Sequence, residues 1–168
     1  GLHSLRFTSL NEGSGFGPMI DDISISRNII FSESFESPVV NVTNYPLFNG
    51  DWVNFGTGTP GFMAGSNAPV GESFTGDSGI EWSIPIGNVD LVVDDHLTAA
   101  EGVQSLNLNG FEQGAIEASI NFPAIGNYTL IFALSKNPTG VDVAKLSVTL
   151  DSVEPLGSPY SYDSSNSA

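Results

Sequence analysis

Residues 17–38 read GPMIDDISISRNIIFSESFESP, and this stretch decides the predicted fold. It contains two strand-like runs, residues 19–25 and 29–35, separated by the polar step at residues 26–28. Two such runs joined by a short step predict an antiparallel hairpin. Alternation along the first run predicts one shared face for four side chains: Met19, Asp21, Ile23 and Ile25.

The carboxylates of this hairpin predict a calcium site. A carboxylate on an apolar face, such as Asp21, must be neutralised, hydrogen-bonded or bound to a cation. Because calcium prefers carboxylate oxygens, we expect a structural calcium ion at Asp21 and Glu36, with Asp22 or Glu33 as alternative ligands. The alternatives are solvated acids, or an Asp21 that accepts hydrogen bonds from backbone N–H groups. Convergence of Glu33 and Glu36 would need a bulge near Ser34.

The charge of the chain argues against several classes of partner. There are 19 Asp and Glu against 4 Lys and Arg, for a formal charge of −15. Phosphate binding needs a basic patch, so we expect neither nucleic acid nor an anionic membrane surface as a partner. No apolar run reaches the roughly 20 residues of a membrane span. Low lysine with much Gly, Ser, Asn and Thr is typical of extracellular or cell-surface proteins, which is the location we expect.

Alternating apolar residues along the rest of the chain predict an all-β fold. Six further runs follow this pattern, with Gly or Pro in most gaps: residues 4–10, 80–84, 89–93, 116–122, 128–134 and 145–151. Many short strands of this kind predict an antiparallel β-sandwich, or jelly roll. The pattern fails over the aromatic-rich residues 39–79, where we expect short strands at 39–43 and 51–55. The polar residues 154–168 predict a tail or linker.

Several segments resemble one known family. They are GPMIDDISIS, NIIFSESFESP, AAEGVQSLNLNG (99–110), GAIEASINF (114–122), NYTLIFALSKNPTG (127–140) and KLSVTL (145–150). Together they resemble the DUF642-like, or choice-of-anchor C, type of extracellular carbohydrate-binding-module jelly roll. The resemblance implies a galactose-binding-like sandwich in which calcium ties the opening strand to the closing strand. The order is out of phase, because the closing strands come first here, and a tryptophan-bearing strand between KLSVTL and LRFTS is absent.

The out-of-phase order predicts how copies of the chain associate. Residues 1–27 would finish one module, and residues 28–168 would begin the next, with its jelly-roll sandwich at residues 28–153. Either residues 1–26 fold back onto their own sandwich, leaving one strand position empty, or they complete a neighbouring subunit. The second arrangement predicts head-to-tail filaments. The exchanged strands would carry Leu5, Phe7, Met19, Ile23 and Ile25.

Two functions follow as hypotheses. The first is a structural, non-enzymatic extracellular protein that polymerises by strand complementation and is stabilised by calcium. The second is a carbohydrate-binding module for cell-wall or matrix polysaccharide. Its sugar-stacking residues would be Tyr45, Trp52 and Phe55, unless these rings only anchor residues 39–79 to the core.

We expect no enzymatic activity. The chain lacks cysteine, a G-x-S-x-G elbow, a phosphate-binding loop and an H-E-x-x-H motif. Its first histidine, His3, has no recognisable partner in the sequence. The second lies in Asp94-Asp95-His96, which predicts an exposed turn.

Overall fold

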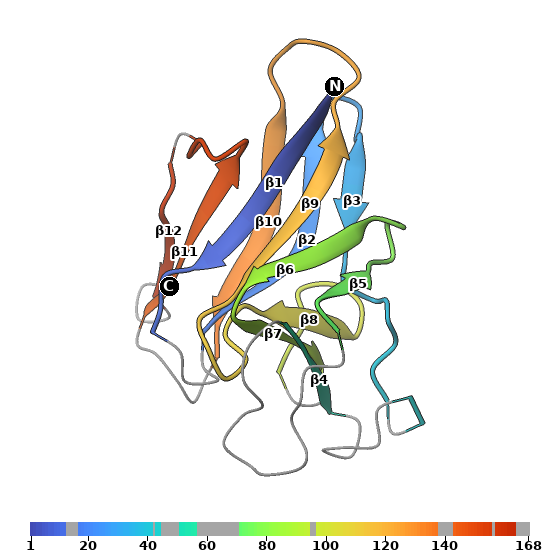
Figure 1. Ribbon diagram of the computed structural model, residues 1–168, viewed down its shortest axis with the longest axis vertical. Helices are drawn as coiled ribbons and strands as arrows, with labels where there is room; N and C mark the ends of the chain where they lie inside the picture. The colour runs from blue at the N-terminus through green and yellow to red at the C-terminus, as the bar shows by residue number, and fades with distance from the viewer. Residues whose placement is uncertain are drawn as a thin grey trace.

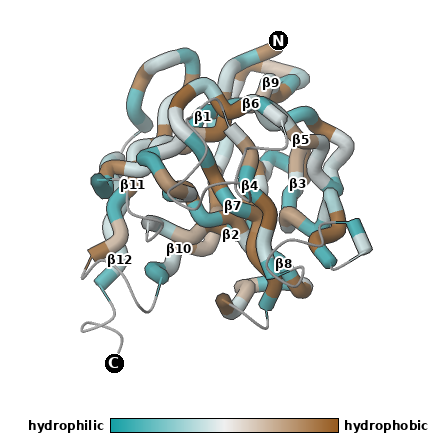
Figure 2. Tube along the Cα trace, turned by 60° about the horizontal axis from the view of Figure 1, so that its bottom comes forward, coloured by the Kyte–Doolittle hydropathy of each residue, from teal (hydrophilic) through white to brown (hydrophobic). Residues whose placement is uncertain are grey.

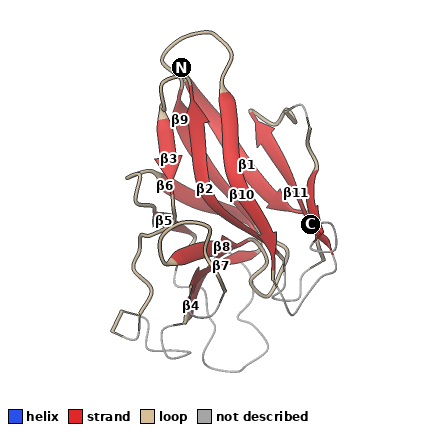
Figure 3. Cartoon of the chain, turned by 180° about the vertical axis from the view of Figure 1, so that it is seen from behind, coloured by secondary structure: helices blue, strands red, loops and turns tan. Residues whose placement is uncertain are grey.

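A computed structural model describes residues 1–12, 17–41, 43–44, 51–56, 71–94, 97–137, 143–155 and 157–163. Within these ranges the chain is all β, and two antiparallel sheets lie face to face (Figure 1). Seen from behind, the same ranges show strands and loops only (Figure 3). None of them forms a helix that is long and apolar enough to cross a membrane. The prediction of an all-β, antiparallel β-sandwich is therefore confirmed.

The first sheet, sheet A, has β1 near its centre. Its strand order is β12 (Tyr160–Asp163), β11 (Val143–Leu150), β1 (Leu2–Ser9), β9 (Ala115–Asn121), β6 (Glu81–Ile86) and β5 (Ser73–Thr75). Leu5 of β1 is paired with Leu150 of β11 on one side and with Ala118 of β9 on the other.

The second sheet, sheet B, is built around β2. Its strand order is β10 (Thr129–Lys136), β2 (Pro18–Ser26), β8 (Gln104–Asn107), β7 (Asn88–Val93) and β4 (Trp52–Gly56). The short strand β3 (Phe31–Glu33) pairs with the second half of β2, so the predicted hairpin forms. The core between the sheets is apolar and rich in aromatic rings: Trp82 of β6 contacts Phe7, Phe31 and Phe35. Figure 2 shows the hydrophobic residues along these strands.

The N-terminal strands lie in the sheets of their own chain. Because β1 is hydrogen-bonded directly to β11, no strand position is empty between them, and the prediction of an empty position is wrong. Leu5, Phe7, Ile23 and Ile25, which we expected on exchanged strands, belong to the core of this chain.

A bulge in β2 changes the face on which Asp21 lies. Asp22 has a positive φ of 46°, and the pairing of β2 with β10 shifts at this point. The extra residue places Ile20 in the core together with Ile23, so Met19 and Asp21 point to the outer face of sheet B. The prediction that Asp21 shares a face with Ile23 and Ile25 is wrong for this reason.

Two segments have a secondary structure that differs from the prediction: residues 39–43 and the predicted tail at residues 154–168. The predicted strand at 51–55 is β4, whereas the described residues of 39–43 form no strand. The predicted tail contains β12, in which Tyr160 packs against Phe132 with ring centroids 5.1 Å apart. Tyr160 is therefore part of the sandwich, because its ring covers one side of the core.

Candidate binding groove

The outer face of sheet B carries a groove of about 360 Å³. Its floor comes from three neighbouring strands, β10, β2 and β8. Met19 is paired with Ser135 and with Asn107, and Asp21 is paired with Ala133, so these side chains share one face. Residues 97–100, which precede β8, form a wall of the groove. The volume falls in the size range of small-molecule sites.

The floor of the groove contains the buried hydroxyl of Ser105. Ser105 is 2% exposed, and its Oγ has no hydrogen-bond partner among the described residues. Its neighbour Leu106 belongs to the core, so alternation directs Ser105 to the outer face. A buried hydroxyl without a partner costs about 1–3 kcal/mol, and a ligand or water that accepted a hydrogen bond from it would recover part of this cost.

Asp21 and Glu36 hold the loop that forms the groove wall. The amides of Ala100 and Glu101 donate to Asp21 Oδ2 at 2.7 and 2.9 Å. The amides of Val103 and Gln104 donate to Glu36 Oε1 at 2.8 and 2.9 Å. Burial raises the pKa of Asp21, and the charge of Glu36 adds to the rise, while three backbone N–H groups oppose it.

The other two predicted calcium ligands point elsewhere. Asp22 is exposed at the bulge, and Glu33 is buried in the core beside Trp82. Phe35 has a positive φ of 56°, and Glu33 and Glu36 on either side of it contact different elements. Among the residues that the structure describes, no group of three or more His, Cys, Asp or Glu side chains could hold a metal ion. The contacts of Asp21 are those of the alternative in which backbone N–H groups satisfy it, and calcium stays a prediction.

The structure bears differently on each of the three predicted sugar-stacking residues. Phe55 is 4% exposed and packs on Phe74 with centroids 5.1 Å apart, so its ring cannot stack on a sugar. Its assignment as a sugar-binding residue is wrong, because β4 directs it into the core. Trp52 is half-buried and contacts Phe111 at 5.7 Å. Tyr45 lies outside the described residues.

Beside the groove, sheet B buries a row of polar side chains. Asn54, Asp90 and Asn107 are paired across β4, β7 and β8, and each is at most 7% exposed. Asn54 Nδ2 donates to Asp90 Oδ1 at 2.7 Å, and burial raises the pKa of Asp90 to about 7. Oδ1 of Asn54 and Nδ2 of Asn88 have no partner among the described residues. Trp52 of β4 is paired with Val92 of β7, and Val92 is paired with Ser105 of β8, so the buried Val92 separates Trp52 from the groove floor.

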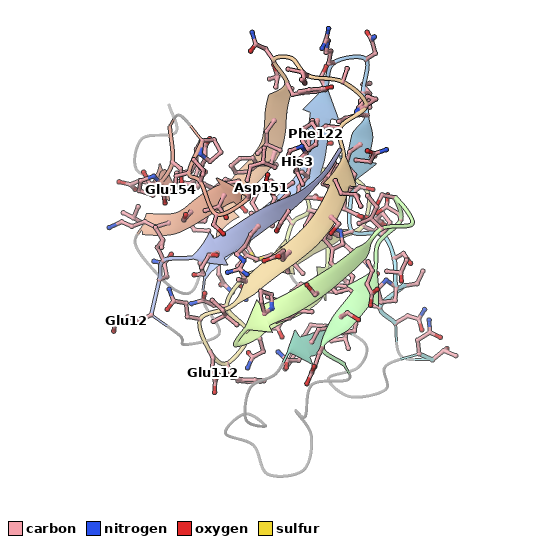
Figure 4. All side chains as sticks on the ribbon, turned by 45° about the horizontal axis from the view of Figure 1, so that its top comes forward. His3, Glu12, Glu112, Phe122, Asp151 and Glu154 are labelled. Atoms are coloured by element: carbon pink, nitrogen blue, oxygen red, sulfur yellow. The ribbon has the colours of Figure 1, made fainter. Side chains whose placement is uncertain are left out.

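The structure contains a histidine–carboxylate pair that the sequence did not predict. His3 Nδ1 lies 2.6 Å from Asp151 Oδ2, and Phe122 meets the His3 ring edge-on at 5.3 Å (Figure 4). The hydrogen bond with His3 lowers the pKa of Asp151. No local signal could reveal this pair, because 148 residues separate its members. Of the predicted exposed turn, Asp95 and His96 lie outside the described residues.

Comparison with known proteins gives no match: no protein-family model, no curated protein and no solved structure matches the chain. The resemblance to the DUF642-like jelly rolls therefore stays a prediction that rests on the sequence segments quoted above.

Proposed function

We propose that the chain is a non-enzymatic carbohydrate-binding module of an extracellular protein, and that the groove on sheet B takes one sugar unit of a polysaccharide. The groove carries this proposal, because its floor holds a buried hydroxyl with no partner among the described residues. A pre-formed concave site with a few polar groups among apolar ones is the usual form of a small-ligand site.

The chemistry of the groove suits a neutral sugar. Leu97 and Ala133 offer apolar surface to the C–H face of a pyranose ring. The hydroxyls of Ser105 and Ser135 can bond to sugar hydroxyls. The net charge of −15 disfavours polyanionic polysaccharides, because like charges repel.

Trp52 supports the same proposal from another part of sheet B. It is the one described residue of the predicted stacking set that is not in the core, and an indole face can stack on a sugar ring. Because buried residues separate Trp52 from the groove, it would form a second contact for a longer chain rather than part of one pocket.

The proposal is tested by closing the groove without disturbing the core. Ala133→Phe places a ring over the floor from β10, and Ile131→Phe is the matched control on the same strand. Ile131 is 54% exposed and does not line the groove. Binding to insoluble neutral polysaccharides and to their soluble oligosaccharides is measured by pull-down and calorimetry.

We expect Ala133→Phe to weaken binding at least about tenfold, because the ring occupies the space of the sugar, and Ile131→Phe to bind like the wild type. Absence of binding to every neutral polysaccharide tested would contradict the proposal. Equal binding by the wild type and Ala133→Phe would show that the sugar binds outside the groove.

A further inference from the structure

The wall of the groove depends on two carboxylates from distant parts of the chain. Asp21 comes from β2 and Glu36 from the segment after β3, and both accept hydrogen bonds from the loop at residues 100–104. The contacts of Asp21 span 79 and 80 residues of sequence, and those of Glu36 span 67 and 68. Ala100 both lines the groove and donates to Asp21, which connects the carboxylate to the shape of the site.

The loop wraps closely around Glu36. Gly102 lies between the two pairs of donating amides and has a positive φ of 66°. A Cβ atom at this position would lie 2.2 Å from Glu36 Oε1. The loop therefore needs glycine here for both its backbone conformation and its approach to the carboxylate.

The two carboxylates use their oxygens differently. Asp21 Oδ1 accepts the amide of Asp22 at 2.8 Å, and Oδ2 accepts two loop amides, so both oxygens face donors. The two loop amides that Glu36 accepts both bond to Oε1. An asparagine at position 21 must direct its NH₂ group at an N–H donor, whereas a glutamine at position 36 can keep its acceptor oxygen in place.

We infer that Asp21 and Glu36 are positioning residues. They fix the loop at residues 100–104, which continues the groove wall of residues 97–100, and thereby set the affinity of the groove for its ligand. The part about affinity rests on the proposed function, while the part about the wall does not. Hydrogen bonds to ionised acceptors are about twice as strong as those between neutral groups, so the two carboxylates add strongly to the other contacts of this segment, such as the bond from the amide of Ala99 to Asp94 Oδ1.

The test measures the stability of the loop and the binding of the ligand in separate experiments. Amide hydrogen exchange, followed by NMR, is compared among the wild type, Asp21→Asn, Glu36→Gln and the control Asp22→Asn. Asp22 is exposed and adjoins Asp21, so its variant controls for the loss of a negative charge at this place. Amides of β1 and β9, in the middle of sheet A, report on global unfolding.

We expect Asp21→Asn to speed exchange at Ala100 and Glu101 by about tenfold or more. Glu36→Gln should speed exchange at Val103 and Gln104 by a smaller factor, and Asp22→Asn should change none of the four. Exchange in β1 and β9 should speed up by no more than the same factor, because lost hydrogen bonds also lower the global stability of the fold. Unchanged exchange at the four loop amides, or a greater acceleration in sheet A than in the loop, would overturn the inference.

The ligand arm uses the polysaccharide that binds the wild type. Binding weakened in Asp21→Asn and kept in Asp22→Asn supports the link between wall and affinity, and equal binding in both overturns it. If the wild type binds no polysaccharide, the proposed function fails, and the exchange rates alone decide whether the two carboxylates position the wall.

Discussion

The indole Nε1 of Trp82 donates a 3.0 Å hydrogen bond to Oε2 of Glu33, and this bond joins the two sheets through the core. Glu33 lies on β3 of sheet B, and Trp82 lies on β6 of sheet A. The hydroxyl of Ser78 donates to the same oxygen, and the amides of Phe35 and Asp77 donate to Oε1. Burial raises the pKa of Glu33 to about 6, and its hydrogen bond with Asp77 adds to the rise.

Removing this carboxylate should destabilise the sandwich. Glu33→Ala leaves four donors without their acceptor, of which the Phe35 amide and the Trp82 indole are buried, and we expect a loss of at least about 3 kcal/mol in the free energy of unfolding. Glu33→Gln keeps the shape but directs an NH₂ group at two of the donors, so its loss should be smaller. Urea unfolding followed by tryptophan fluorescence measures both. A loss below about 1 kcal/mol for Glu33→Ala would show that these bonds do not stabilise the fold.

Asp90 should make stability fall as the pH rises. Its pKa in the folded chain is about 7, above the ordinary value of 3.8. A raised pKa means that the folded state holds the proton more tightly, so the stabilisation is complete below the ordinary value and is lost as pH rises through about 7.

Asp90→Asn removes this dependence, because an amide stays neutral and its oxygen can still accept from Asn54. We expect the variant to gain about 2–4 kcal/mol over the wild type at about pH 8, and little at about pH 4. Thermal unfolding across this range measures the difference, with the exposed Glu72→Gln as control. A constant difference between Asp90→Asn and the wild type would contradict the prediction.

Substitution of Phe55 should mainly lower stability, whereas substitution of Trp52 should mainly weaken binding. Phe55→Ala removes a ring from the core and should cost about 3–5 kcal/mol. Trp52→Ala removes a half-buried ring and should weaken polysaccharide binding more than it weakens the fold. Calorimetric binding and urea midpoints are measured on the same preparations. Full binding by Trp52→Ala would exclude this ring from the site.

Head-to-tail assembly through exchanged N-terminal strands stays a prediction, as does its stabilisation by calcium. In solution it predicts particles larger than one chain, which become smaller when a chelator removes calcium. Light scattering and negative-stain microscopy with calcium and then with chelator measure this. A monodisperse monomer in both conditions would contradict filament formation and calcium dependence together, and would agree with β1 and β2 lying in their own chain.

Much of the fold could be predicted from period-two patterns. In β1 the pattern correctly places Leu5, Phe7 and Ser9 on the buried side, because each contact of a strand with the core repeats at every second residue. The same rule failed at Asp22, since a bulge inserts one residue and reverses every face beyond it. No local signal in IDDIS marks which of the two acids takes the bulge.

The sequence by itself determined the class of the fold, most of its longer strands, and the excess of negative charge, because these follow from local alternation and from composition. Only the tertiary structure decided what surrounds each carboxylate. Three acidic residues look alike in the hairpin sequence, yet their surroundings differ. Asp21 accepts from Ala100 of the groove wall, Glu33 accepts from Trp82 in the core, and Glu36 accepts from Val103 at the other end of the loop. Their partners lie tens of residues away, and a carboxylate's chemistry depends on which donors and how much water surround it.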